Sequence, residues 1–332
     1  MLWLTKQYLV LAHQVAEDDC MSLVSARFRV DFLLLFVAAA WGSTYLAAKE
    51  LASTDTVVAL LAVRMFCAAV LMVAVLVVRR KRVTAAELSA GVSIGLLLSA
   101  VFALETFGIA HTSATNAGLI ISLTLVFTPL LESVVARRML PGRFFSAALM
   151  SVAGVVLLAG DGSFSSPGVG DVLMLAAAVV RALHVVTMHR VSRGKTLDSL
   201  SLTTVQLGMC AAVFAASSLV FGEPIVAYLT CLSVWQAVLC LYLVLVCTVF
   251  AFFVQLWAIR RTSPSRVSLL LGTEPVWAAV VGIGIAHDAV AAVGYAGIIL
   301  VLAGTAWGRS LTHTKLQSTP TEAPRPLVDR RP

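Results

Sequence analysis

The chain has 332 residues, of which 60% are hydrophobic and only 12% charged, and its mean hydropathy is +0.96. Soluble domains carry roughly 25% charged and roughly 45–50% apolar residues, so this composition excludes a soluble globular protein. The apolar runs are long and continuous, whereas the strands of a transmembrane β-barrel alternate every second residue. The sequence therefore predicts an all-α polytopic membrane protein.

Ten apolar windows, separated by charged or glycine- and proline-containing breaks, predict ten transmembrane helices. Ten spans of about 20 residues use about 200 residues, which leaves no room for a separate soluble catalytic domain. In chain order the predicted helices are Val30–Ala48, Val57–Val78, Leu88–Ala110, Ala114–Val135, Phe144–Gly160, Asp171–Met188, Leu200–Phe221, Ser233–Ile259, Ser265–Ala286 and Ala289–Gly308.

Two tails flank these spans. The apolar run within residues 1–29 is too interrupted for a signal peptide, and Met21 is an alternative start of the chain. Residues 309–332 are polar, contain four prolines and show no apolar periodicity, which predicts a disordered tail.

The basic residues predict the orientation, because Lys and Arg collect in short cytoplasmic loops. With the N-terminus inside, 21 of the 24 Lys and Arg residues fall in cytoplasmic segments, and the external loops hold only Lys49. We therefore expect both termini in the cytoplasm and the protein in the inner (plasma) membrane. The same asymmetry accounts for the net charge of +7, so no nucleic-acid partner is expected.

Nothing in the sequence indicates a cofactor, a metal or a catalytic residue. The six cysteines include no CxxC pair, so they predict neither a disulfide framework nor a zinc site. The sequence contains no HExxH, GxSxG or phosphate-binding-loop motif. Gly91-x-x-x-Gly95 and Gly304-x-x-x-Gly308 predict close contacts between helices.

The two halves of the chain resemble each other in the same order. The offset between matching segments is 140 residues for Asp31–Leu35 and Asp171–Leu175, 143 for Cys67–Val70 and Cys210–Val213, and 150 for Ile109–Ser113 and Ile259–Ser263. Each half has five spans, so the second must enter the membrane inverted, an arrangement typical of secondary transporters. We therefore predict two inverted five-helix repeats, residues 30–160 and 170–308.

Short motifs spread over Asp31–Gly308 resemble the EamA family of the drug/metabolite transporter superfamily. They are Trp41-Gly42-Ser43, Arg64, Thr112-Ser113, Asn116-Ala117-Gly118, Gln206, Thr262-Ser263, Glu274-Pro275-Val276 and the Gly297–Gly304 segment. The resemblance implies a transporter that moves a small polar or amphipathic metabolite, commonly an amino acid or a related compound, outward across a bacterial-type inner membrane.

The sequence departs from the family pattern at two points. Pro129 lies four residues beyond the position that matches Pro275, which predicts that the fourth and ninth spans break at different depths. Arg181 stands where the family usually has an aromatic residue matching Trp41.

Arg181 lies about ten residues into its span, which places it roughly 15 Å deep, near the midplane. Charges at this depth are costly and usually functional or paired. His184 follows on the same helix face. Two interpretations are open: Arg181 holds an anionic group of a substrate, or it forms a structural pair with Glu274 or Glu105.

The other candidates are polar or aromatic residues on apolar helices. Glu105 and Gln255 are equivalent under the repeat, and each either frames the cavity or satisfies a neighbouring helix. Arg64 is expected to be a structural arginine that bonds carbonyls. The candidate substrate-binding residues are Arg181, His184, Trp41, Tyr45, Glu105, Gln255 and Glu274.

The leading interpretation is a secondary exporter of a small metabolite that works by alternating access. One alternative is uptake or exchange of nucleotide-type or sugar metabolites. The other is a membrane-embedded lipid-modifying enzyme with Arg181, His184 and Glu274 as its site. A proton is a candidate coupling ion through Glu105 or Glu274, and both a monomer and a homodimer are open.

Overall fold

The computed structural model describes residues 29–53, 55–137, 142–159, 168–192, 196–221, 225–261, 267, 270–288 and 290–317. The predicted N-terminal tail up to residue 28, the loop 160–167 and residues 318–332 lie outside the described residues. Every regular element within the described ranges is a helix, as the composition predicts.

The helices follow the predicted apolar windows closely. The first helix is Arg29–Leu51. It is followed by α2 (Val57–Val78), α3 (Ala85–Ala110), α4 (Ala114–Ile121), α5 (Thr124–Ala136), α6 (Gly142–Ala159), α7 (Val169–Ser192), α8 (Ser199–Phe221), α9 (Ile225–Cys231), α10 (Val234–Val244), the π-helical η1 (Leu245–Phe250), α11 (Ala251–Arg261), α13 (Glu274–Gly284) and α14 (Ala292–Gln317). The last helix continues nine residues beyond the predicted boundary at Gly308.

Seven helices in the described part of the chain are long and apolar enough to cross a membrane. They are Arg29–Leu51, Val57–Val78, Ala85–Ala110, Ala114–Val135, Val169–Ser192, Ser199–Val220 and Val234–Arg260. Three shorter apolar helices are Phe145–Gly154, Glu274–Gly284 and Ala292–Gly304. Large apolar side chains such as Val78 and Leu219 are exposed on the outside of the bundle, where lipid would cover them.

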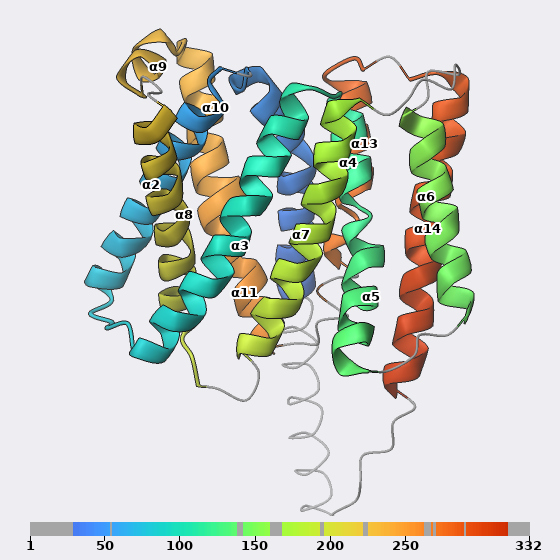
Figure 1. The fold of residues 1–332 in the computed structure, drawn as a ribbon, viewed down its shortest axis with the longest axis horizontal. Helices are drawn as coiled ribbons and strands as arrows, with labels where there is room; N and C mark the ends of the chain where they lie inside the picture. Colours follow the sequence, from blue (N-terminus) through green and yellow to red (C-terminus); the bar gives the residue numbers. More distant parts are fainter. Residues whose placement is uncertain are drawn as a thin grey trace, which may run out of the picture.

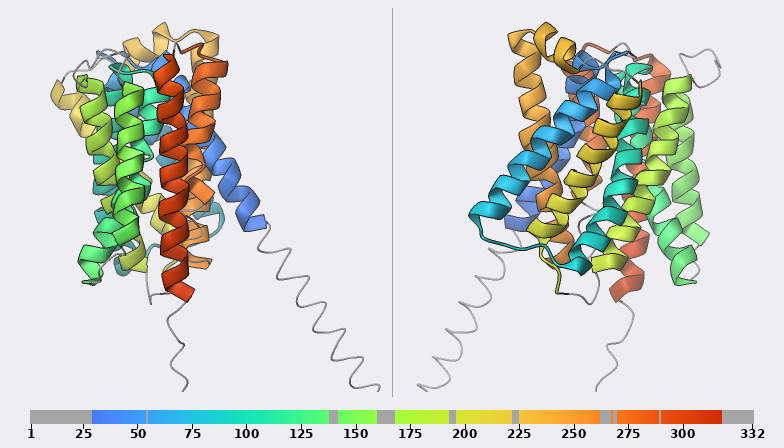
Figure 2. Two further views of the ribbon diagram at one scale, coloured as in Figure 1. Left: turned by 90° about the vertical axis from the view of Figure 1, so that its right-hand side faces the viewer. Right: turned by 60° about the vertical axis from the view of Figure 1, so that its left-hand side comes forward.

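The helices stand side by side in one bundle (Figure 1). α6 and α14 form a pair at one end of the bundle, α2 and α8 lie at the opposite end, and α3 and α7 stand between them. The start of the first helix and the end of α14 lie at the same face (Figure 2). The exposed basic segment from Arg79 to Arg82 also lies at this face.

Glycines bring the central helices together. A Cβ added at Gly91 would lie 2.5 Å from the Val205 Cβ atom, and one at Gly95 would lie 2.8 Å from the Gln206 carbonyl oxygen. Only a residue without a Cβ therefore lets α3 approach α8 this closely. The predicted contact role of this glycine pair is confirmed. At the edge of the bundle, Gly304 faces Ala147 and Ser151 and lets α14 pack on α6.

Turns interrupt the helices inside the fourth and ninth predicted spans. A turn at residues 122–123 separates α4 from α5, and a turn at residues 272–273 precedes α13. The two turns are 150 residues apart, and each includes a short i−3 backbone bond, from Leu123 to Ile120 at 3.1 Å and from Thr273 to Leu270 at 3.2 Å.

The prediction that the two spans break at different depths was wrong, because neither break is set by its proline alone. Pro275 lies in the first turn of α13, where a missing N–H is tolerated. Pro129 lies inside α5, six residues after the turn. Pro129 removes the helical hydrogen bond to the Leu125 carbonyl, but the helix continues through it to Ala136.

A polar network ties two loops together at the basic face. The Asp198 side chain pairs with Lys81 and accepts a hydrogen bond of 3.1 Å from the Ser201 N–H at the start of α8. Glu87 forms a capping box with Thr84 and also accepts a hydrogen bond of 2.7 Å from the Asp198 N–H. Burial raises the pKa of Asp198, but the bonds from Lys81 and the backbone outweigh it, so the pKa is lowered overall.

Candidate functional site

A cluster of charged side chains lies halfway along the bundle, around Arg181 on α7. The Arg181 Nη1 donates to Glu105 Oε1 and to Glu274 Oε1, both at 3.2 Å, and Nη2 donates to Glu274 Oε2 at 3.0 Å. The guanidinium is therefore bidentate towards Glu274, the geometry that favours strong arginine–carboxylate pairs. The three side chains are 9–15% exposed, so both ion pairs are largely shielded from solvent.

Trp41 and Tyr45 of the first helix complete this cluster. The Arg181 guanidinium carbon lies 4.7 Å from the centroid of the Trp41 ring, a distance that gives a favourable cation–π interaction. The Tyr45 hydroxyl donates to Glu274 Oε1. The first helix can pack closely against α13 because Gly42 has no Cβ at the contact. A Cβ added at Gly42 would lie 2.5 Å from Trp277 Cβ and 2.9 Å from the Glu274 carbonyl oxygen.

A second arginine, Arg64 on α2, lines one cavity together with Arg181. Its Nε donates to Thr248 Oγ1 at 2.8 Å, and its guanidinium carbon lies 4.8 Å from the Phe102 ring centroid. The hydrogen bond goes to a hydroxyl, whereas the sequence predicted bonds to carbonyls. With Arg64 included, the cavity holds two arginines and the two carboxylates of Glu105 and Glu274.

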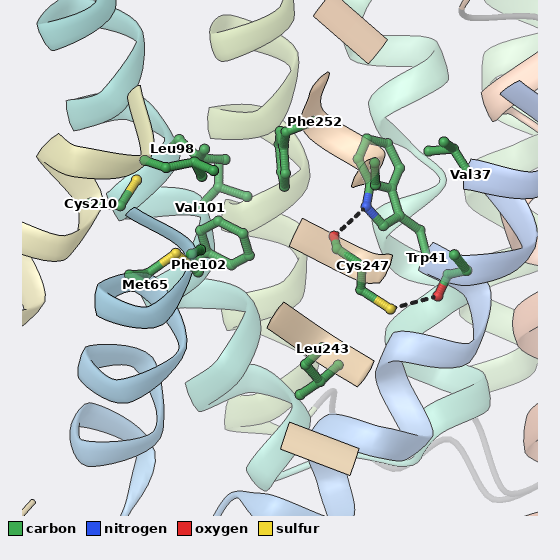
Figure 3. Packing of buried hydrophobic residues seen from close by; sticks show 14 of the residues in the cluster. Val37, Trp41, Met65, Leu98, Val101, Phe102, Cys210, Leu243, Cys247 and Phe252 are labelled. Atoms are coloured by element: carbon green, nitrogen blue, oxygen red, sulfur yellow. Dashed lines mark hydrogen bonds between the residues drawn. The ribbon is translucent and has the colours of Figure 1, made fainter. Parts of the chain in front are cut away.

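Thr248 belongs to the π-helical segment η1, which widens the eighth predicted span beside the cavity. The Trp41 Nε1 donates to the Cys247 carbonyl at 3.0 Å, and Phe252 contacts the rings of Trp41 and Phe102 with centroid distances of 5.3 and 5.7 Å (Figure 3). Short π-helical segments occur frequently at functional sites. No sequence signal marks this one, since all but one of its residues are apolar.

All seven residues predicted to bind substrate line one cavity of about 30 Å³, which we call the first cavity. Sequence reasoning did not include eight further lining residues, namely Thr44, Arg64, Leu98, Val101, Phe102, Val185, Cys247 and Phe252. Such a volume is enough to hold water.

Two buried polar atoms on this cavity lack a hydrogen-bond partner among the described residues. They are His184 Nε2 and Gln255 Oε1, whose residues are 2% and 4% exposed. A buried polar atom without a partner costs about 1–3 kcal/mol. Both residues line the first cavity, so a molecule bound there would lie beside them.

A second cavity of about 50 Å³ adjoins the first. The two cavities share Trp41, Arg181, Val185, Gln255 and Glu274 as lining residues. The Arg181–Glu274 pair therefore lines both cavities.

A bundle of apolar helices around a buried, paired arginine, with broken helices at mid-depth, is the architecture of a membrane transporter. A sequence model of the EamA-like transporter family matches residues 28–160 and again residues 168–307. The chain belongs to the EamA-like transporter family.

Similar proteins agree with this assignment. An uncharacterized transporter of Archaeoglobus fulgidus is 26% identical over 280 residues, which cover 83% of this chain and 84% of that protein. A second uncharacterized transporter of the same organism is 26% identical over 184 residues, and the match spans 61% of its length. One crystal structure matches 87% of this chain and 99% of its own with a TM-score of 0.60 at 20% identity, a likeness of fold.

Proposed function

We propose that the protein is a secondary exporter of a small carboxylate-bearing metabolite, such as an amino acid or a related compound, which it moves by alternating access. The observation that carries this proposal is the bidentate pair between Arg181 and Glu274 in a mid-span cavity. A solute carboxylate has the same shape and charge as the Glu274 side chain, so it can take its place on the guanidinium.

The charges of the site also favour a solute that carries a positive group. When a solute carboxylate displaces Glu274, that glutamate loses its partner, and an unpaired buried charge is costly. A solute ammonium group can pair with the freed carboxylate, and so can a proton from water. The unpaired atoms of His184 and Gln255 offer further hydrogen bonds to such a solute.

We further propose that the chain forms ten spans in two inverted repeats, residues 30–160 and 170–308. The family match to two successive segments supports this division. Helices that the repeat makes equivalent also pack on each other, namely α2 with α8 and α6 with α14. Two inverted halves around one site can exchange outward-open and inward-open shapes.

The side-chain positions agree with the same symmetry. Trp41 and Arg181 are equivalent at the offset of 140 residues, and Glu105 and Gln255 at 150. All four line the first cavity. The basic segment at the face that holds the start of the first helix and the end of α14 supports cytoplasmic termini in the inner membrane.

Counterflow in proteoliposomes tests this function, with labelled amino acids, nucleosides and sugars as the panel. We expect saturable, protein-dependent exchange of at least one carboxylate-bearing solute. Exchange limited to nucleosides or sugars would favour the alternative of a nucleotide-type or sugar permease. Turnover of the vesicle lipids without any exchange would indicate an enzyme and would refute the proposal.

A further inference from the structure

The second cavity lies beside the turns at residues 122–123 and 272–273. Most of its lining residues have no role in the function proposed above. It is lined on one side by residues at the turn between α4 and α5, including Ile121, Ser122 and Leu125. On the other side it is lined by Leu271 and Gly272, next to the turn before α13.

The walls come from equivalent positions of the two repeats. At the offset of 150 residues, Ile121 matches Leu271 and Ser122 matches Gly272, and all four line the cavity. Thr124 likewise matches Glu274, which is one of the shared residues between the two cavities. The second cavity therefore lies on the interface of the halves, where transporters hold their substrates.

The chemistry of the second cavity differs from that of the first. Away from the residues that it shares with the first cavity, its walls are aliphatic side chains, proline, glycine and three hydroxyl residues; the aliphatic ones are Ile121, Leu125, Ile259, Val267 and Leu271. Two of its three hydroxyls are engaged, since Ser122 Oγ donates to the Leu119 carbonyl at 2.6 Å and Thr124 Oγ1 to the Ala178 carbonyl at 3.2 Å. A ligand group that extends away from Arg181, Gln255 and Glu274 would therefore meet mainly aliphatic side chains.

We propose that the second cavity is the subsite for the apolar tail of the transported solute, and that it selects short aliphatic tails. This inference rests on the proposed function, because it requires the solute carboxylate to sit on Arg181. Because Arg181 and Glu274 line both cavities, a solute whose carboxylate replaces Glu274 on Arg181 can extend its tail into the second cavity.

The volume sets the length of the tail. A cavity of about 50 Å³ is a third of the roughly 150 Å³ that accommodates a benzene-sized ligand, and a water-sized group occupies about 30 Å³. The subsite thus has room for about two carbon atoms. Each buried methylene contributes about 0.8 kcal/mol, which is about a fourfold gain in affinity at 1.36 kcal/mol per tenfold change.

The test is counterflow by the full-length protein in proteoliposomes with two straight-chain series. One series comprises the 2-amino acids from glycine to norleucine, and the other the carboxylic acids from acetate to hexanoate. We expect the half-saturating concentration to fall about fourfold per methylene for the first one or two tail carbons, and to rise for longer tails.

Variants that enlarge the second cavity should change the optimum, which is the tail length that gives the lowest half-saturating concentration. Leu125→Ala removes an aliphatic wall from α5, and we expect it to shift the optimum by at least one methylene towards longer tails. Leu271→Ala tests the opposite wall and keeps the experiment decisive if the first variant fails to fold. Leu183→Ala is the matched control, because Leu183 lies on α7, is 40% exposed and lines neither cavity.

The outcomes separate the two proposals. If no carboxylate of either series exchanges, the proposed function is wrong. If exchange occurs but does not depend on tail length, or if both enlarging variants keep the wild-type profile, transport stands and the tail subsite is wrong.

Discussion

Arg181 is the residue whose replacement tests the site most sharply. It donates two hydrogen bonds to Glu274 and one to Glu105, and in the proposed function its fork binds the solute carboxylate. Hydrogen bonds to charged groups contribute about 1.5–3 kcal/mol each. Loss of a bidentate pair in Arg181→Met therefore weakens solute binding by at least about 150-fold, at 1.36 kcal/mol per tenfold change.

Arg181→Lys is expected to fall between the wild type and Arg181→Met. A lysine keeps the charge but cannot form both bonds of the fork. The loss of one charge-assisted bond corresponds to about 10- to 150-fold weaker binding. The assay is the half-saturating concentration for counterflow of a transported amino acid, measured at equal amounts of reconstituted protein.

Stability must be separated from binding in this experiment. Removing one partner of a buried ion pair costs about 3–5 kcal/mol, because the other charge is left unpaired. The double variant Arg181→Met, Glu274→Gln removes both charges, so we expect it to unfold at a higher temperature than Arg181→Met alone. It should still not bind solute, and normal transport by either variant would refute the role of Arg181.

Three further predictions concern other parts of the molecule. Gly42→Ala forces the first helix away from α13 and should lower the free energy of unfolding by about 1–3 kcal/mol. The control is Gly208→Ala, where an added Cβ meets nothing within 4 Å, and it should raise the free energy of unfolding by about 0.5–1 kcal/mol. Equal shifts of the melting temperature in the two variants would contradict the close packing at Gly42. Asp198→Ala should cost about 1 kcal/mol at neutral pH. The pKa of Asp198 is lowered from 3.8 in the folded protein. The stabilisation by this carboxylate is therefore complete above pH 3.8 and is lost as the pH falls through the pKa of the folded protein. A difference in the free energy of chemical unfolding that does not depend on pH would contradict this prediction. An imposed pH gradient should change the wild-type transport rate, and Glu274→Gln should abolish the response; if the gradient affects neither the wild type nor Glu105→Gln, transport is driven by the solute gradient alone.

The sequence predicts the large features of this fold because they depend on long-range averages. Apolar windows of about 20 residues define the helices, and the depth of Arg181 follows from its distance to the start of its span. The ordered offsets between the halves predicted that Trp41, Arg181, Glu105 and Gln255 are related, and the structure brings all four to one cavity. Their role in binding remains a prediction.

The sequence did not predict several local details, because helix breaks and side-chain pairings depend on several weak effects that compete. The break in the fourth span lies at residues 122–123, where no proline or glycine marks it, and Pro129 misled the prediction. The sequence could not choose between Glu105 and Glu274 as partner of Arg181, since the pairing depends on how three helices approach each other. Arg64 was expected to be only structural, yet it also lines the cavity.

Alternating access around this site is the central claim, and cysteine accessibility tests it most directly. Thr44 lines the first cavity, so Thr44→Cys in a chain whose six native cysteines are replaced gives one reporter thiol. A membrane-impermeant thiol reagent is applied from either side of oriented vesicles, with and without a transported solute. We predict labelling from both sides, with a rate that the solute changes in opposite directions on the two sides. Labelling from one side only, whatever the solute gradient, would contradict the account.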